Sequence, residues 1–285
     1  MQTLIYYDQD MDGITAAAVA LKKFPDAILK PVVYGDEWNV NEVVDNRVIV
    51  VDFAFPNMDE LKQFVKIGEF YWIDHHKTSQ KQEVWYDKEI KGNRDVSFSA
   101  CLLAFTTFFN EIKIPQTVEL INDYDLWQFK YAHTKPFYEA AKLYVDGSPH
   151  MATVMLQDED NVNSFVKDCV KQGEILLKNQ RRQVIKAFNS GVDSYFTGIK
   201  CRIVNTINNV SELGEYIYKD MGYPIAIIWS IREKKLVVSL RSNSVDVRGI
   251  AEEFGGGGHK FSSGFSLESK NEIFEKLLKI LGEQR

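Results

Sequence analysis

The stretch Tyr71-Trp72-Ile73-Asp74-His75-His76-Lys77-Thr78 decides the architecture of this chain. Three apolar or aromatic residues run into one acid and two adjacent histidines, with polar residues behind them. The first three predict a buried strand, and the polar residues fall where such a strand would leave its sheet. In open α/β sheets, ligands bind outside those carboxyl ends. An isolated acid with two histidines would be better explained as a surface loop, so a ligand site is predicted only if neighbouring segments carry similar residues.

A similar arrangement stands at the start of the chain. Residues 3–7 predict a short β-branched and aromatic strand, and residues 14–23 predict an alanine-rich helix. Between them stand three acids at alternate positions, Asp8, Asp10 and Asp12. One aspartate is enough to cap a helix, so this crowding exceeds a structural need and has ligand-like spacing. A capped turn in solvent is the alternative.

The strand predicted over 47–51 repeats the arrangement, because it ends at Asp52. Alone, this acid would be explained as a helix cap or a turn residue. A helix predicted over 57–66 then leads to the strand over 69–73, which carries the Asp-His-His triplet. Strands and helices that alternate at this spacing predict a mostly parallel sheet with helices on both faces. Since parallel strands share one carboxyl edge, the acids of all three strands should converge.

A fourth acidic pair follows two further predicted helices, over 97–110 and 116–122. The second of these helices ends in Asp123 and Asp125, just before Trp127. The two acids can simply terminate the helix, and the tryptophan can belong to the core. A metal site at the edge of the sheet, however, would need one more acidic group from this part of the chain.

The second half of the chain predicts a separate, smaller α/β domain. A long helical pattern over 163–190 leads into it. Strands and helices are then predicted over 199–204, 211–221, 225–230, 235–241, 247–254 and 270–281. We therefore expect a catalytic domain at 1–160, a connecting helix at 161–192 and a substrate-binding domain at 193–285.

The smaller domain contains four consecutive glycines, Gly255 to Gly258, followed by His259 and Lys260. Glycine lets backbone N–H groups approach an anion closely, and the two basic residues supply positive charge. The sequence therefore suggests a phosphate site. A flexible linker or a packed glycine turn is the alternative, because a glycine run alone is a weak signal.

Composition narrows the class of protein. The chain has 285 residues, 45% of them hydrophobic, and a net charge of −6. An acidic surface is poorly suited to gripping a long duplex, whereas a short phosphorylated substrate in one metal-rich pocket stays compatible with it. The three cysteines are far apart, which predicts buried thiols in a reducing compartment rather than zinc ligands or disulfides. Without a signal sequence or an apolar run of ~20 residues, we expect a soluble, cytoplasmic protein with no membrane partner.

The motifs at the strand ends contain too many acids to share a dry cleft unpaired. These residues are Asp8, Asp10, Asp12, Asp52, Asp74, Asp123 and Asp125, with His75 and His76. Carboxylates with imidazole and no thiolate suit Mn²⁺ or a similar ion, and two ions bridged by one carboxylate can activate water and clamp a phosphate. Metal-assisted phosphoester hydrolysis is therefore predicted. Neither a serine at a nucleophile elbow nor a P-loop lysine motif is present.

With these motifs in this order, the chain resembles the DHH phosphoesterase family, including its associated C-terminal domain, over nearly its whole length. By this resemblance the metal ligands would be Asp10, Asp12, Asp52, His75 and Asp123. Asp52 would bridge the ions, His76 would sit beside the scissile phosphate, and Asp74 would support the metal shell. The groups that bind the substrate would be Arg241, Gly256, Gly257, Gly258 and His259.

The predicted catalytic domain departs from the family pattern at two places. Many members have a histidine where Tyr6 stands here, and Asp8 is the candidate to replace that ligand. The last acidic motif also differs from the usual Asp-Thr, which leaves the choice between Asp123 and Asp125 open.

The resemblance implies a Mn²⁺-dependent phosphodiesterase, with Mg²⁺ or Co²⁺ as substitutes. It would act as an oligoribonuclease-like exonuclease that trims short oligonucleotides, such as nanoRNA and linear dinucleotides, to mononucleotides. A cyclic-dinucleotide phosphodiesterase is the nearest alternative, and the glycine run tells against a pyrophosphatase. A nucleotide-binding regulator with a decayed site is the non-enzymatic alternative. By analogy with the family, closure of the two domains is expected to bring Arg241 and His259 over the metals. RNA or DNA preference and a homodimer are left open.

Overall fold

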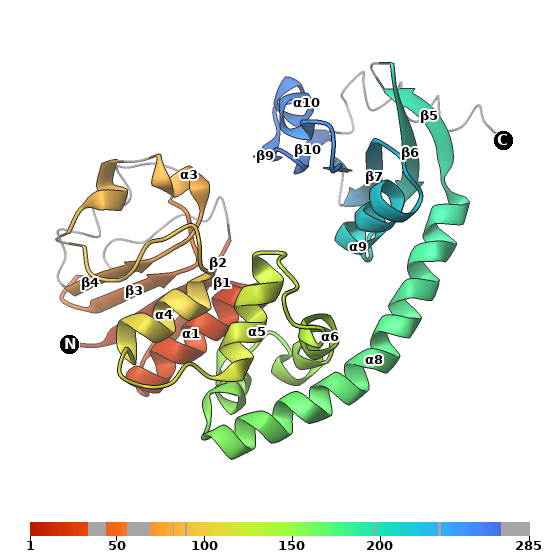
Figure 1. Cartoon of the computed structure of the whole chain (residues 1–285). Coiled ribbons are helices and arrows are strands. Elements are labelled where there is room, and N and C mark those ends of the chain that lie inside the picture. The colour runs from red at the N-terminus through yellow and green to blue at the C-terminus, as the bar shows by residue number, and fades with distance from the viewer. Residues whose placement is uncertain are drawn as a thin grey trace. The chain divides into compact units, whose positions relative to one another are not determined.

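The computed structural model describes residues 1–33, 44–55, 69–81, 83–88, 90–196, 198–232 and 235–268 (Figure 1). The chain divides into two compact units, Met1–Leu177 and Lys178–Arg285. Each unit has its own sheet and its own hydrophobic core. The helices predicted over 57–66 and 270–281 lie outside the described residues.

The first unit is built on a four-stranded parallel sheet in the order β2-β1-β3-β4. Its strands are β1 (Thr3–Asp8), β2 (Ile28–Val32), β3 (Arg47–Val51) and β4 (Glu69–Ile73). The chain moves from β1 to β2 on one side and continues with β3 on the other side of β1. The winding direction therefore reverses between β1 and β3, and such a switch point is where ligands bind in open α/β sheets.

Both faces of this sheet are buried, because successive strand residues point to opposite sides. Ile49 and Val51 belong to one core cluster, and Val48 and Val50 belong to the other. The first cluster includes residues of α1 (Met11–Lys23) and α4 (Ala100–Phe108). The second includes Trp85 of η2 (Glu83–Tyr86), which follows α3 (Lys77–Gln80). Figure 1 shows α1 and α4 to one side of the strands and α3 to the other.

The rest of the first unit is helical. Its elements are α5 (Gln116–Asp125), α6 (Thr134–Val145), α7 (Pro149–Ala152) and η3 (Thr153–Leu156). The 32-residue α8 (Glu159–Ser190) then runs from the first unit into the second. A Cβ at Gly173 of α8 would lie 1.7 Å from the Pro136 carbonyl oxygen, so glycine is required for the close approach of α8 to α6. Gly173 therefore marks a packing contact inside the continuous helix α8.

The second unit has a six-stranded mixed sheet in the order β5-β6-β7-β8-β10-β9. Its elements are β5 (Val192–Phe196), β6 (Ile199–Asn205), α9 (Val210–Glu215), η4 (Tyr216–Asp220), β7 (Ile225–Arg232), β8 (Lys235–Arg241), α10 (Val247–Glu253), β9 (Gly257–His259) and β10 (Ser262–Glu268). The predicted fold class, a mostly parallel α/β unit followed by a smaller α/β unit, is confirmed.

Two further expectations can be compared with the described residues. Cys101, Cys169 and Cys201 are free and buried, as predicted. In the part of the chain that the structure describes, no helix combines the length and the apolar character needed to cross a bilayer.

Candidate active site

Acids and histidines from three strand ends and one helix end meet at the carboxyl edge of the first sheet. Their side chains form three groups whose potential ligand atoms lie within 4.8 Å of one another. These groups are Asp8, Asp10 and Asp52; Asp12, His75 and Asp125; and Asp52, His75 and His76. We call these seven residues the acid cluster. The cluster lies at the ends of β1 and β3, which is where the winding of the sheet reverses.

The acids behind β1 are held by different parts of the backbone. Asp10 caps α1, since its carboxylate accepts a hydrogen bond from the Gly13 N–H at 2.9 Å. Asp12 is buried in the first turn of α1 and accepts from the first two N–H groups of α4 at 2.6 and 2.9 Å. A Cβ at Gly13 would lie 2.3 Å from the Asp8 carbonyl oxygen, so only glycine lets α1 begin this close to the strand. The tight turn thus brings all three acids to one place.

Asp52 ends β3 in a strained conformation. Its φ of 57° lies in the left-handed region, which costs a non-glycine residue of the order of 1 kcal/mol or more. Its backbone N–H donates to the Ile73 carbonyl at 2.9 Å, which ties the ends of β3 and β4 together. The side chain is 2% exposed, and its Oδ1 accepts no hydrogen bond from the described residues. Strain together with an unsatisfied buried oxygen is typical of a functional position.

Asp74 orients the two histidines. It is fully buried, and its Oδ1 accepts from the N–H groups of His75 and His76 at 2.9 and 3.3 Å. The same oxygen lies 2.6 Å from Nδ1 of the His76 ring. Burial lowers the pKa of His76, but the hydrogen bond and the charge of Asp74 outweigh it, so the pKa is raised overall. Asp74 therefore both fixes the ring and favours its charged form.

The two acids at the end of α5 have separate environments. Asp123 is buried, and its carboxylate accepts from the Lys130 N–H at 2.9 Å, the Tyr131 N–H at 3.4 Å and the Thr134 hydroxyl at 2.5 Å. Asp125 instead points its Oδ2 at His75, 3.6 Å from Nε2, and this oxygen has no hydrogen-bond partner among the described residues. The structure thus brings Asp125 into the acid cluster and leaves Asp123 outside it, which favours Asp125 in the choice that the sequence left open.

The electrostatics of the cluster follow from this crowding. Burial, followed by the charges of Asp12 and Asp10, raises the pKa of Asp52 well above its ordinary value. Burial and then Asp12 raise the pKa of Asp125 to about 8. Among the described residues, the partners of opposite charge are the two histidines. The oxygens without donors and the donor set of carboxylate and imidazole fit a divalent cation.

The residue that departs from the family pattern lies away from the cluster. Tyr6 is 8% exposed and packs in the second core cluster, on the sheet face that also carries Val48 and Val50. Asp8, two residues later, has its carboxylate grouped with those of Asp10 and Asp52. This position of Asp8 agrees with its proposed role in place of the family's histidine, which stays a prediction.

In the second unit, two of the predicted phosphate-binding residues, Arg241 and His259, lie in one row of the sheet. Arg241 ends β8 and pairs with Ser262 of β10, which in turn pairs with His259 of β9. Directly opposed residues of antiparallel strands point to the same face, so the side chains of Arg241 and His259 share a face. The Arg241 guanidinium donates to the carbonyls of Leu240 and Ser263 at 3.0 and 3.4 Å.

The glycine run leads into β9 and is folded against β10, so it is not a linker. Gly255 and Gly258 have positive φ values of 76° and 134°. A Cβ at Gly256 would lie 2.1 Å from the Gly264 carbonyl oxygen, whereas a Cβ at Gly257 would meet no described atom within 4 Å. Three of the four glycines therefore have a structural reason. The backbone at Gly257 leaves room for an approaching group, and anion binding there stays a prediction.

One residue of this region was missed by sequence reasoning. A Cβ at Gly214 in α9 would lie 2.5 Å from Cγ of Arg241, so glycine is needed for α9 to lie against this side chain. An isolated glycine in a predicted helix often has such a packing reason, and this was the available signal.

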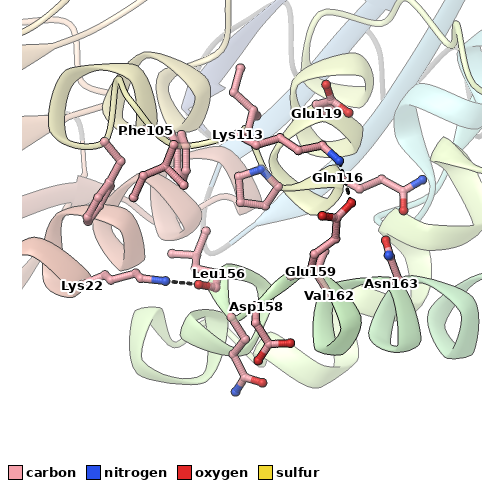
Figure 2. Close-up of a pocket in the computed structure, with 15 residues that line it drawn as sticks. Lys22, Phe105, Lys113, Gln116, Glu119, Leu156, Asp158, Glu159, Val162 and Asn163 are labelled. Carbon is pink, nitrogen blue, oxygen red and sulfur yellow. Dashed lines mark hydrogen bonds and ion pairs between the residues drawn. The ribbon is translucent and has the colours of Figure 1, made fainter.

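A cavity of about 500 Å³ lies elsewhere in the first unit and is separate from the acid cluster (Figure 2). Its lining includes Phe105 and Val162, and no residue of the acid cluster. Both of its lysines already have partners, since Lys22 donates to the Leu156 carbonyl and Lys113 pairs with Glu159 at 2.6 Å. The cavity therefore offers little to an anionic substrate.

Two family models match the chain. The model of the DHH family N-terminal domain matches residues 2–124, and that of the DHHA1 domain matches residues 200–284. The first range contains all the motifs of the acid cluster except Asp125, and the second contains Arg241 and the glycine run.

Among curated proteins, the chain is 25% identical over 307 residues to oligoribonuclease NrnB of Bacillus subtilis, covering 95% of the chain and 74% of the relative. It is 25% identical over 249 residues to the bifunctional oligoribonuclease and PAP phosphatase NrnA of Mycoplasma genitalium, covering 79% and 70%.

Two solved structures share the fold. The pGpG-specific phosphodiesterase PggH from Vibrio cholerae has a TM-score of 0.55 at 13% identity, with 100% of this chain and 98% of that chain covered. Exonuclease RecJ bound to manganese has a TM-score of 0.50 at 14% identity, with 98% and 88% covered. At these identities the likeness concerns the fold alone.

Proposed function

Because the chain belongs to the DHH family of phosphoesterases and carries a DHHA1 domain, we propose that it hydrolyses short oligonucleotides, including linear dinucleotides, to mononucleotides. The observation that carries this proposal is the acid cluster, in which buried oxygens of Asp52 and Asp125 have no hydrogen-bond donor among the described residues. Two relatives at 25% identity that are named oligoribonucleases support the substrate class. The activity would be that of an oligoribonuclease-like exonuclease.

The acid cluster would hold the catalytic metal, Mn²⁺ by preference, with Mg²⁺ or Co²⁺ as substitutes. The proposed ligands are Asp8, Asp10, Asp12, Asp52, His75 and Asp125. Asp52 is the proposed bridge between two ions, because it is the one acid that belongs to two of the three groups. When bound, such ions lower the pKa of a bound water and polarise the phosphate. Asp123 would act on the loop after α5 and not as a ligand, since its oxygens accept hydrogen bonds from that loop.

His76 is the proposed general acid or electrostatic partner of the scissile phosphate. Its Nδ1 is held at 2.6 Å by Asp74, which leaves Nε2 as the ring nitrogen to face the substrate. A raised pKa favours the protonated form of this ring, and a charged donor stabilises the negative charge that develops on phosphate oxygens. Asp74 would therefore act through His76.

The second unit would supply the groups that hold a terminal nucleotide. Arg241 and His259, which share one face of the sheet, would bind phosphate oxygens. The backbone N–H groups of Gly256 to Gly258 would approach the same anion, because glycine exposes them. We expect Arg241→Ala to weaken hydrolysis of a linear dinucleotide, and unaffected turnover would refute this role.

Product analysis on a matched substrate panel with Mn²⁺ tests the proposal. The panel holds a linear RNA dinucleotide, a short and a long RNA strand, a cyclic dinucleotide and pyrophosphate. We expect rapid loss of the linear dinucleotide and the short strand, and no turnover in a chelator. Preference for the cyclic dinucleotide or for pyrophosphate would overturn the substrate class. Absence of turnover on the whole panel would overturn the enzymatic proposal in favour of a nucleotide-binding regulator.

A further inference from the structure

We propose that residues 126–134, here called the aromatic loop, form a platform on which a nucleobase of the substrate stacks, with Trp127 as the stacking ring. The inference rests on the proposed function and names the place where a base would bind. In the sequence, Trp127 could be explained as a core residue that follows the end of a helix.

The aromatic loop is fixed directly beside the acid cluster. Asp125, the last residue of α5, belongs to the cluster, and Trp127 follows two residues later. Two such residues have Cα atoms at most ~7 Å apart. The buried carboxylate of Asp123 holds the other side of the loop through its bonds to the Lys130 N–H and the Thr134 hydroxyl. A nucleotide whose phosphate binds at the cluster therefore has the aromatic loop within its reach.

The Trp127 ring is exposed and yet supported by neighbouring rings. Trp127 keeps 38% of its surface exposed, which excludes the alternative that it fills the core. It packs edge to face against Phe129, with ring centroids 4.7 Å apart, and against Tyr124 at 5.4 Å. Tyr124 in turn stacks in parallel on Tyr138, with centroids 3.4 Å apart. A ring held by its neighbours loses little freedom when a base stacks on it.

The underlying stack reaches the acid cluster electrostatically. Burial, followed by the charges of Asp10 and Asp125, raises the pKa of the Tyr138 hydroxyl. Tyr124 directly precedes Asp125 in α5, so the stack of Tyr138, Tyr124 and Trp127 begins beside the acid cluster and ends at the exposed Trp127.

A cation accompanies the rings. Nζ of Lys135 lies 4.2 Å from the Phe129 ring centroid and 5.4 Å from that of Trp127. Positive charge is scarce around an acid cluster in a chain of net charge −6. Aromatic rings interleaved with a cation form the kind of surface that binds single-stranded nucleic acid, because bases stack on the rings and the cation attracts the backbone.

The backbone conformation of the loop is a further sign that the exposed position of Trp127 is imposed by the surrounding structure. Trp127 and Phe129 both have positive φ, 53° and 50°. This conformation is unfavourable for bulky side chains, and it persists only where the surroundings impose it. Here the bonds from Asp123 supply that constraint, and the result is an exposed ring.

The test compares Trp127→Ala and Trp127→Phe with wild type in the full-length protein with Mn²⁺. The substrates are a linear RNA dinucleotide and two abasic versions of it, one without the 5′ base and one without the 3′ base. We expect Trp127→Ala to raise KM for the complete dinucleotide by about 10- to 100-fold, as for a lost base stack, with a smaller change in kcat. Trp127→Phe should retain most of the affinity. For the abasic version that lacks the base bound by Trp127, wild type and Trp127→Ala should have similar KM values.

Tyr144→Ala is the matched control, since Tyr144 is an aromatic residue of α6 with a similar exposure of 39%. It should leave KM for all of these substrates unchanged. If Trp127→Ala lost the same factor on every abasic substrate, the ring would be structural and the proposal would be overturned.

A binding experiment separates this proposal from the proposed function and does not depend on turnover. Tryptophan fluorescence of the folded wild type and of Trp127→Phe is titrated with AMP, with circular dichroism to verify the fold. Quenching that disappears in Trp127→Phe supports the platform, even if no substrate of the panel is hydrolysed. Quenching that persists unchanged in Trp127→Phe overturns the platform, even if dinucleotides are hydrolysed rapidly.

Discussion

Acids at the two edges of the first sheet have pKa values shifted in opposite directions. At the amino edge, Glu69 begins β4, and its carboxylate lies 2.6 Å from Nε of Arg47 and 2.7 Å from Nζ of Lys91. The bond from Lys91, followed by those from Arg47 and Tyr71, lowers the pKa of Glu69 to about 2 in spite of burial. At the carboxyl edge, burial and neighbouring acids raise the pKa of Asp125 to about 8.

The difference shows which acids serve the fold and which await a ligand. An acid surrounded by cations and donors favours folding, because its charged form is stabilised in the native state. A buried acid without such partners disfavours folding, so its presence points to a role in binding or catalysis. Asp123 and Asp125 repeat this contrast two residues apart, since the first accepts three hydrogen bonds and the second has a buried oxygen with none from the described residues.

The largest effect is expected from removing the charge of Asp52. Asparagine preserves the shape and tolerates the left-handed backbone at φ 57°. We expect Asp52→Asn to lower dinucleotide hydrolysis by about a thousandfold or more, because the proposed bridge between metal ions is lost. In a chelator, the same variant should unfold at a higher temperature than wild type, since it relieves repulsion from Asp10 and Asp12. Near-native turnover would refute the assignment of Asp52.

A second pair of variants separates the two acids at the end of α5. Asp125→Asn should weaken Mn²⁺ binding and reduce turnover by about 10- to 100-fold while the fold persists. Asp123→Asn should destabilise the protein by about 1 kcal/mol or more, because one of the donors that its buried carboxylate binds would lose its acceptor. Calorimetric Mn²⁺ titration and urea unfolding of both variants measure these effects. The opposite pattern, with metal binding lost only in Asp123→Asn, would reverse the assignment.

Much of the fold follows from periodicity and composition. The strands predicted over 3–7, 47–51 and 69–73 are confirmed, because parallel strands buried on both faces are continuous apolar runs. The strand β2 was missed since it contains Lys30 and Pro31. Its place at the edge of the sheet explains why proline is tolerated there, and the sequence alone does not reveal which strand is the edge.

The candidate site was predictable in position but not in detail. Convergence of the acids follows from topology, since parallel strands deliver their ends to one edge. The choice between Asp123 and Asp125 depends on how residues 126–134 fold back onto the helix end, which is a long-range contact. The left-handed backbone of Asp52 and the exposure of Trp127 likewise depend on tertiary structure, and no local pattern indicates them.

A smaller effect is expected from pH in the metal-free protein. An acid whose pKa is raised in the folded state binds a proton that the unfolded state has lost, so stability falls as pH rises between the two pKa values. For Asp125 this interval runs from the ordinary value of 3.8 to about 8. His76, whose pKa is also raised, acts in the same direction above its ordinary value. We therefore expect the melting temperature in a chelator to fall from pH 5.5 to pH 8.

Mn²⁺ should reverse this trend. Metal binding requires ionised carboxylates and releases protons, so the stabilisation by Mn²⁺ should grow with pH over the same interval. Melting curves with and without Mn²⁺ provide the comparison, and Asp125→Asn is the control that should flatten the metal-free slope. A melting temperature that rises with pH in the chelator would contradict the raised pKa values of the carboxyl edge.

The smallest effect is expected at the amino edge. Glu69→Gln removes the partner of Arg47 and Lys91, but Lys91 is 53% exposed and water screens the pair. We expect a loss of about 1 kcal/mol or less in urea unfolding at pH 7, with dinucleotide turnover unchanged. Since the pKa of Glu69 is lowered, this stabilisation is present above the ordinary value of 4.5 and disappears as pH falls towards about 2. If Glu69→Gln instead reduced turnover as strongly as Asp52→Asn, charge pairing would not distinguish the structural acids of this sheet from its functional ones.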